Sequence, residues 1–262
     1  MKSVVAALLG LAALAAPVQA QEPNPVAAGG ALRVVFLGGN PAQAVRTPAG
    51  ETLGPAADLA RELGRRLGLP VEIKPIPGPP QVIEEVAGGR ADIGFVAYEP
   101  SRTGTVEFSQ TYILVHQTFI VREDSKIRTV ADIDRAGQKI AGTTNDSITL
   151  YLARTLKNAT PLAVENDQDA NKKKLMAGEF DAFSGNRHRM TTWMREMPGT
   201  RVLPDNLFSV PQTIVVPKGK PEALAAVNKL IDDARASGLI QKSIEANGLI
   251  GVEVAPPGVP RN

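Results

Sequence analysis

Strands and helices alternate over the first third of the chain, and this alternation constrains the fold more than any other feature. Apolar runs at residues 31–37, 71–76 and 93–97 have the length and composition of buried strands. Between the first two runs, apolar residues recur at helical spacing from Pro55 to Leu67, directly before Gly68. Strands and helices in this order predict a parallel sheet with helices on its faces.

A second alternation follows between two long extended runs, at residues 115–121 and 209–216. Its predicted strands lie at 139–141, 162–164 and 180–183, and its predicted helices at 147–156 and 167–176. Because the extended runs bracket this unit, we predict two α/β lobes joined by two crossing strands. Lobe 1 is discontinuous and comprises residues 31–117 and 214–262, and lobe 2 comprises residues 118–213.

Residues 1–20 have the pattern of a signal peptide. A lysine near the start precedes an apolar stretch, and Val18, Gln19 and Ala20 form a small-residue cleavage site. The chain contains no cysteine, which excludes disulfides, thiol nucleophiles and a lipid-bearing cysteine after the leader. We therefore expect an exported protein that is free in the periplasm.

Composition excludes several classes of function. The net charge is +2 without long basic runs and aromatic residues make up 4% of the chain, so nucleic-acid binding is not expected. The two histidines, His116 and His188, are far apart in sequence and have no partners at metal-ligand spacing. We predict no metal site and no cofactor. With 43% apolar residues, a chain of this length can build its core without disulfides.

Arg102 is the first candidate for a binding residue. It follows the predicted strand at 93–97, in a break marked by Pro100 and Gly104. A guanidinium just past the end of a parallel strand offers a planar pair of donors to a carboxylate. The alternative interpretation is an ordinary surface arginine in a loop.

Four sequence blocks, in order, resemble one known family. They are GPAADLARELGRRLG at 54–68, the segment at 91–112 in which Arg102 precedes Phe108-Ser109 by six residues, KIAGTT at 139–144, and AGEFDAFSGN at 177–186. The chain thus resembles the periplasmic solute-binding proteins of ABC importers, of the polar amino-acid-binding type (bacterial extracellular solute-binding protein family 3). The resemblance implies a two-lobed periplasmic-binding-protein fold of type II, the Venus-flytrap architecture.

The resemblance also implies roles for particular residues. It places Arg102 on the ligand's α-carboxylate, with Thr144, and Thr143 beside it, binding the same group from the second lobe. Residues in this turn open the helix predicted from Ser147, and free N–H groups at a helix start favour an anion. The alternative is that Thr144 and Asp146 only cap that helix.

Departures from the family pattern bear on the ligand. Where amino-acid binders of this type carry an acid for the α-ammonium, this chain has Asn186, and an amide cannot neutralise a buried ammonium. The usual hydroxyl five residues before the arginine is replaced by Ala97, and Gln43 lies in the segment that replaces an aromatic wall. Tyr98 forms either a wall of the cleft or a half-exposed strand end.

We therefore predict a binding protein, not an enzyme. It captures a small, carboxylate-bearing or otherwise anionic polar solute between its lobes, as a monomer, for an ABC permease of the inner membrane. An amino acid remains a candidate ligand if Asp92, Glu99 or another acidic residue binds its ammonium group. One alternative is a cyclohexadienyl-dehydratase-like enzyme on the same fold, for which Glu99 could act as general acid or base. Another is a soluble ligand sensor for a membrane receptor.

Overall fold

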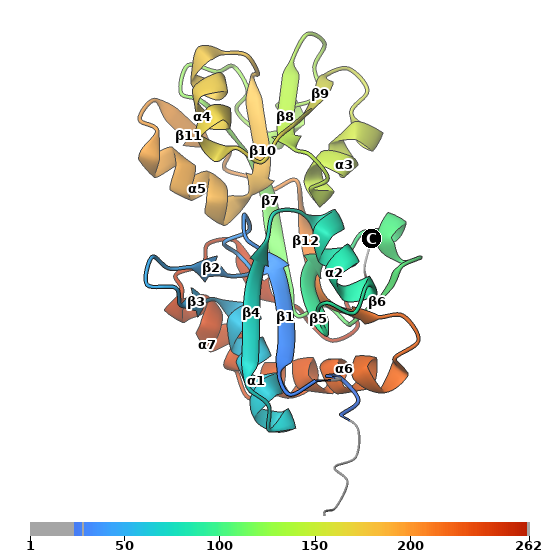
Figure 1. Cartoon of the computed structure of the whole chain (residues 1–262). Helices are drawn as coiled ribbons and strands as arrows, with labels where there is room; N and C mark the ends of the chain where they lie inside the picture. Colours follow the sequence, from blue (N-terminus) through green and yellow to red (C-terminus); the bar gives the residue numbers. More distant parts are fainter. Residues whose placement is uncertain (1–23, 28, 261–262) are drawn as a thin grey trace, which may run out of the picture.

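The computed structural model of the protein describes residues 24–27 and 29–260. The signal peptide predicted at residues 1–20 lies outside the described residues. The chain forms two lobes joined by two long strands, with the lobe that contains both the first and the last helices drawn at the bottom of Figure 1. We call this the lower lobe and the other the upper lobe.

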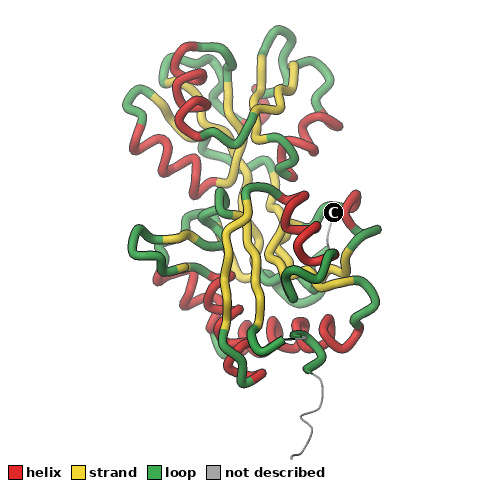
Figure 2. The backbone as a smooth tube through the Cα atoms, in the orientation of Figure 1, coloured by secondary structure: helices red, strands yellow, loops and turns green. Residues whose placement is uncertain are grey.

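The described strands are β1 (Leu32–Leu37), β2 (Val45–Arg46), β3 (Thr52–Leu53), β4 (Val71–Ile76), β5 (Ile93–Ala97), β6 (Val106–Phe108), β7 (Ile113–Arg122), β8 (Lys139–Thr143), β9 (Thr160–Val164), β10 (Ala182–Asn186), β11 (Thr200–Val202), β12 (Phe208–Pro217) and β13 (Val252–Val254). The described helices are α1 (Pro55–Leu67), α2 (Pro79–Ala87), α3 (Ser147–Thr155), α4 (Gln168–Ala177), α5 (Arg187–Glu196), α6 (Pro221–Ala236) and α7 (Leu239–Ala246), with short 3-10 turns η1 (Pro100–Arg102) and η2 (Val130–Asp132). Figure 2 shows how strands run through the middle of each lobe with helices on both sides.

One continuous sheet runs through both lobes in the order β4-β1-β5-β12-β7-β10-β8-β9. The pairing is parallel among β4, β1 and β5 in the lower lobe and among β10, β8 and β9 in the upper lobe. The central strands β12 and β7 are antiparallel to each other and span the two lobes. This arrangement confirms the predicted fold class, with its two crossing strands. The lobe boundaries predicted at 117/118 and 213/214 fall inside these strands.

The lower lobe buries both faces of its sheet. Phe36 and Phe95 face a core shared with α1, α6 and α7, whereas Val35 and Val96 face a smaller core under α2. Because the strands have helices on both sides, they read in the sequence as continuous apolar runs. Helix α1 ends where Gly68 adopts a left-handed conformation, with φ of 66°, as its sequence predicted.

The upper lobe is built in the same way. In β7, Phe119 faces a core with α3 while Ile120 faces a core with α5. Gly142 in β8 is required by close packing, because a Cβ atom there would lie 2.3 Å from the hydroxyl oxygen of Thr149 and 2.5 Å from that of Ser184. The start of α3 is thereby held tightly against the end of β8.

Some elements differ from the sequence prediction. The strand expected at 180–183 is β10, at 182–186, because it pairs with β7 from Ala182 opposite Val121 to Asn186 opposite Gln117. Asn186 is consequently the last residue of a strand. The short strands β2, β3, β6 and β11, and β13 near the Pro/Gly-rich end, were not predicted, since runs of two or three residues carry too little periodicity.

Candidate ligand-binding cleft

A cavity of about 50 Å³ lies between the lobes, beside the crossing strands. We call it the cleft cavity. Its walls are Leu37, Gly39, Asn40, Pro77, Pro79, Ala97, Arg102, Gln117, Asp146, Ser147, Ile148, Asn166, Asn186, Arg189, Val210 and Gln212. Both lobes and both crossing strands contribute, so the cavity changes shape if the lobes move.

Arg102 enters the cleft cavity from the lower lobe. It closes η1, directly after β5, and its Nη1 donates to the carbonyl oxygen of Ala97 at 3.1 Å. Its Nη2 donates to the carbonyl oxygen of Asn145 in the upper lobe at 2.9 Å. Burial lowers the pKa of Arg102, and the carboxylates of Glu99 and Asp146 oppose that shift. The guanidinium is thus a partly desolvated cation, which favours binding of an anion.

The upper lobe faces this arginine with the start of α3. Asn145 adopts a left-handed conformation, with φ of 63°, and so turns the chain from β8 into the helix. Asp146 occupies the N-cap position without accepting a side-chain capping bond, and Ser147 is the first helical residue. The hydroxyl oxygen of Ser147 is buried and has no hydrogen-bond partner within the described residues. A donor group and a helix N-terminus therefore border the cavity opposite Arg102.

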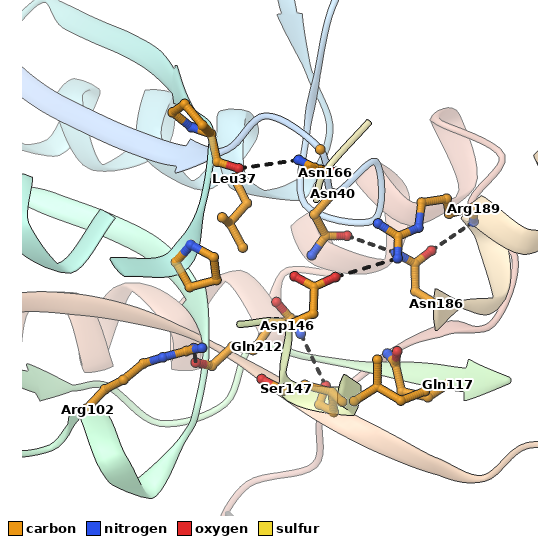
Figure 3. Close-up of a pocket in the computed structure, with 16 residues that line it drawn as sticks. Leu37, Asn40, Arg102, Gln117, Asp146, Ser147, Asn166, Asn186, Arg189 and Gln212 are labelled. Carbon is orange, nitrogen blue, oxygen red and sulfur yellow. Dashed lines mark hydrogen bonds and ion pairs between the residues drawn. The ribbon is translucent and has the colours of Figure 1, made fainter. Parts of the chain in front are cut away.

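Helix α5 brings a second cation to the same cavity. The side chain of Arg189 is 8% exposed and forms an ion pair with Asp146, with 3.5 Å between Nη2 and Oδ2. Its guanidinium also lies 5.9 Å from the ring centre of Trp193. Burial raises the pKa of Asp146, while Arg189 and Arg102 oppose the rise. The carboxylate forms an ion pair with Arg189, as Figure 3 shows, and also feels the charge of Arg102, so the three side chains together carry a net positive charge.

Four polar contacts join the lobes around the cavity. Besides the bond from Arg102 to Asn145, Asn186 Nδ2 donates to Asn40 Oδ1 at 3.2 Å and Asn166 Nδ2 to the Pro77 carbonyl oxygen at 3.4 Å. The fourth contact pairs Arg154 Nη1 with Glu99 Oε1 at 3.2 Å. The lobes are therefore in contact across the cleft, which corresponds to a closed conformation.

Three of the predicted site residues, Arg102, Ala97 and Asn186, line the cleft cavity. The Asn186 side chain also caps α5 by accepting from the Arg189 backbone N–H at 2.8 Å. Gln43 lies behind the wall, where its Nε2 donates to Gln212 Oε1 at 2.7 Å and so orients a residue that does line the cavity.

The other predicted residues lie beside the cavity. Thr144 donates from both its backbone N–H and its hydroxyl to the carbonyl oxygen of Val164, at 2.8 and 3.0 Å. Thr143 is the buried last residue of β8. Tyr98 packs edge-on against Phe108, with 5.2 Å between ring centres, and borders a neighbouring cavity. The structure thus groups Arg102 with the helix starts, and not with Thr143 and Thr144.

Sequence reasoning missed Ser147 and Arg189 as cleft residues, and treated Asp146 only as a cap. It also passed over Gln117 and Gln212, which are buried polar residues in the two crossing strands and line the cavity. A polar residue inside a buried strand is a signal that could have identified them. Within residues 24–27 and 29–260, no group of three or more acidic or histidine side chains is placed to hold a metal ion.

Comparisons with known proteins identify the family of the chain. The sequence model of "Bacterial extracellular solute-binding proteins, family 3" matches residues 32–247. In the described part of the chain, no helix has the length and apolar character needed to cross a membrane. A search of curated protein sequences gives no match.

Solved structures show the same fold at low sequence identity. The amino acid ABC transporter substrate-binding protein AbpA from Streptococcus pneumoniae, bound to L-arginine, superposes with a TM-score of 0.72 at 21% identity, covering 83% of this chain and 94% of that one. A binding component of an ABC transporter from Wolinella succinogenes, complexed with lysine, gives 0.72 at 21% identity, with coverage of 83% and 95%. The ancestral amino-acid-binding protein AncCDT-1, a precursor of cyclohexadienyl dehydratase, gives 0.71 at 24% identity, with coverage of 83% and 94%. On the family match, which spans most of its length, this chain belongs to the bacterial extracellular solute-binding proteins, family 3.

Proposed function

We propose that this protein captures a small carboxylate-bearing solute, an amino acid or a related organic acid, between its lobes and delivers it to an ABC importer. The observation that carries the proposal is the position of Arg102. Its guanidinium is partly shielded from solvent and lines the cleft cavity, where it contacts both lobes. A carboxylate that replaces the Asn145 carbonyl as its partner gains a charge-assisted pair of hydrogen bonds.

The upper lobe completes the site from the start of α3. The unpartnered Ser147 hydroxyl and the first N–H groups of this helix support binding of an anion held by Arg102, because Ser147 and Arg102 line the same cavity. In this conformation Thr144 is engaged with Val164, so a direct role for Thr143 and Thr144 requires the turn to rearrange when ligand enters. Asn186 contributes an amide, which can bind a hydroxyl or a keto oxygen as well as an amine.

The charges of the residues that line the cleft cavity determine which charged groups the ligand can have. With Arg102 and Arg189 against Asp146 alone, the walls favour an anion, and Asp146 is the acid in the wall that could face an ammonium. The related structures bound to arginine and lysine favour amino acids, whereas Asn186 favours acids without the ammonium. Both ligand classes share the carboxylate at Arg102.

Delivery follows from the two-lobed design. A ligand that contacts both lobes stabilises the closed form, because its differential affinity shifts the open–closed equilibrium. We propose that a permease of the inner membrane recognises this closed form, with the protein monomeric and free in the periplasm after removal of residues 1–20.

The test is a thermal-shift screen of the purified protein against polar amino acids, keto acids, dicarboxylates and aromatic acids, since a ligand of the folded state raises the melting temperature. We expect hits that share a carboxylate and that disappear when the acid is replaced by its amide. Hits that persist when the acid is replaced by its amide would contradict the proposal. In the variant Asn186→Asp, preference should move from acids without an amine towards the matching amino acids.

A second candidate function is a dehydratase acting on a cyclic carboxylic acid. One observation favours it, the raised pKa of the Asp146 carboxyl inside the cavity, which is the property a general acid needs. Incubation with cyclohexadienyl acids should then produce an aromatic absorbance that is lost in Asp146→Asn. Binding of such an acid without turnover would exclude this candidate.

A further inference from the structure

A second, larger cavity adjoins the cleft cavity. It has a volume of about 400 Å³ and lies between the lobes, next to the last described residues of the chain. Its walls are Tyr98, Glu99, Pro100, Leu114, Ser147, Tyr151, Arg154, Phe208, Ser209, Val210, Pro211, Val259 and Pro260. Ser147 and Val210 also line the cleft cavity, so the two spaces share a wall.

The walls of this second cavity are mainly apolar and aromatic. Tyr151 of α3 packs against Phe208 of β12, with 4.6 Å between ring centres and 45° between ring planes. Tyr98 brings a third ring from the end of β5. The polar edge is the ion pair between Glu99 and Arg154, which also joins the lobes. Rings presented from several sides suit a flat apolar group, because aromatic pairs prefer offset or edge-on contact.

The volumes of the two cavities indicate that each has room for a different part of one ligand. The cleft cavity, at about 50 Å³, has room for a few water molecules or one small polar group. A pocket that encloses a whole small molecule occupies roughly 300–1,000 Å³. Of these two adjoining cavities, the second reaches that range. A ligand whose carboxylate is at Arg102 therefore has space for its remaining atoms past Ser147.

The side chain of Ser147, in the wall that the two cavities share, is consistent with a carboxylate in the cleft cavity and the rest of the ligand in the second cavity. The hydroxyl oxygen of Ser147 is buried and unpartnered within the described residues, and Ser147 borders both cavities. A buried hydroxyl without a partner is costly, and a ligand carboxylate beside it would remove that cost.

We propose that the ligand is a carboxylic acid that carries an aromatic ring, with the carboxylate at Arg102 and Ser147 and the ring in the second cavity between Tyr98, Tyr151 and Phe208. This inference rests on the proposed function and specifies its ligand class. Because the walls of the second cavity come from both lobes, the ring as well as the carboxylate holds the lobes closed.

The experiment measures binding by calorimetry for three pairs of acids that differ only by the ring. These are benzoate with formate, phenylacetate with acetate, and 3-phenylpropionate with propionate. Burial of a phenyl group predicts that at least one ring acid binds roughly thirtyfold tighter than its partner. Testing three linkers allows for the distance between Arg102 and the second cavity.

Two variants test the position of the ring. Ser209→Phe fills the second cavity from β12, and Tyr151→Ala removes one of its ring walls. Both should reduce the affinity for the ring acid about tenfold or more while leaving the small acid unchanged. Ser101→Phe adds the same group at an exposed position of η1 that borders neither cavity, and should change nothing. If the Ser209→Phe variant does not fold, the affinities measured for Tyr151→Ala still test whether the ring binds in the second cavity.

Each outcome separates this inference from the proposed function. Equal affinities for ring and small acids, both lost in Arg102→Ala, would overturn the aromatic ligand but leave the carboxylate site in place. Ring acids that bind in Arg102→Ala as well as in the parent would show a separate apolar site, which also overturns the inference. If none of the six acids binds, the aromatic ligand is also overturned. The thermal-shift screen then tests separately whether the protein binds a carboxylate at all.

Discussion

The two lobes reach the cleft in different ways. The lower lobe supplies Arg102, a single charged side chain on a short turn after β5, held by one bond to the Ala97 carbonyl within its own lobe. The upper lobe supplies two helix starts that follow strands directly, β8 into α3 and β10 into α5, with Asp146 and Asn186 at the N-cap positions. In the lower lobe, binding is therefore separable from folding, whereas in the upper lobe Asn186 also caps α5 and Asp146 also forms an ion pair with Arg189.

The largest expected effect comes from removing the lower-lobe charge. Arg102→Ala should lower the affinity for the carboxylate ligand at least about a hundredfold, since a charge-assisted bidentate contact and its geometry are both lost. Arg102→Lys should recover only part of this loss, because an ammonium cannot form the same planar pair. The free energy of unfolding should change little. Calorimetry and thermal unfolding measure the two quantities.

The matched control is Arg128→Ala, an exposed arginine of the upper lobe. It removes the same charge from the protein without touching the cleft. Equal affinity in the two alanine variants would show that Arg102 is not the anchor.

In the upper lobe, the corresponding change should damage the fold. Arg189→Met removes the ion-pair partner of the Asp146 carboxylate, whose side chain is 27% exposed, which should reduce the free energy of unfolding by about 1–2 kcal/mol at neutral pH. Adding Asp146→Asn should restore much of that loss, because the unpaired charge is gone. A double-mutant cycle measured by denaturant unfolding gives the coupling free energy between Arg189 and Asp146, which we expect to be about 1–2 kcal/mol.

The pH dependence of Arg189→Met gives an independent check. Without the arginine, the already raised pKa of Asp146 rises further, so the folded state binds a proton more strongly than the unfolded state. Stability of the variant should then fall, relative to the parent, as pH rises above the ordinary pKa of an aspartate. A difference between the two proteins that does not depend on pH would contradict this account.

The difference between the lobes also explains which parts of the fold and of the cleft can be predicted from the sequence. Helix α1, the parallel strands and the break that contains Arg102 depend on local patterns, and the structure agrees with them. Arg189 was not identified because an arginine in the first turn of a helix reads as a surface charge. Its burial depends on Asp146, which is 43 residues away and approaches it only once β8 and β10 pair.

Contacts between residues far apart in the chain could not be predicted either. Gln43 contacts Gln212 across a separation of 169 residues, and Asn40 contacts Asn186 across 146. No periodicity within either segment indicates such a contact. The strand predicted to end at Phe183 continues to Asn186 for the same reason, because pairing with β7 decides where it ends.

A smaller effect is expected where the end of the chain contacts the upper lobe. His188 in α5 accepts a hydrogen bond at Nδ1 from the backbone N–H of Ile250, at 3.2 Å. Burial, with a contribution from Arg195, lowers the pKa of His188, so the folded protein favours the neutral ring. Its contribution is complete above the ordinary pKa of histidine and is lost as pH falls below about 6.5.

We expect this loss to reach roughly 1 kcal/mol, the usual contribution of one hydrogen bond. His188→Asn, which keeps an acceptor near the Nδ1 position but does not titrate, should remove the dependence between pH 5 and 7, measured by thermal unfolding. His116→Asn serves as the comparison, and an equal change there would mean that the effect does not arise at the Ile250 contact.

The smallest effect should follow from the ion pair between Glu99 and Arg154, which joins the lobes at the edge of the second cavity. The side chain of Arg154 is 55% exposed although that of Glu99 is 5% exposed, so solvent and salt screen the arginine, and we expect the pair to contribute about 0.5 kcal/mol to closure. Arg154→Met should therefore weaken ligand binding only two- to threefold, and the difference should disappear at high salt. Arg90→Met breaks a pair of similar exposure, Arg90 with Glu85, that lies wholly within the lower lobe. If both variants weakened binding equally, the effect would be one of general charge; if only Arg154→Met did so, the pair would act by holding the lobes closed.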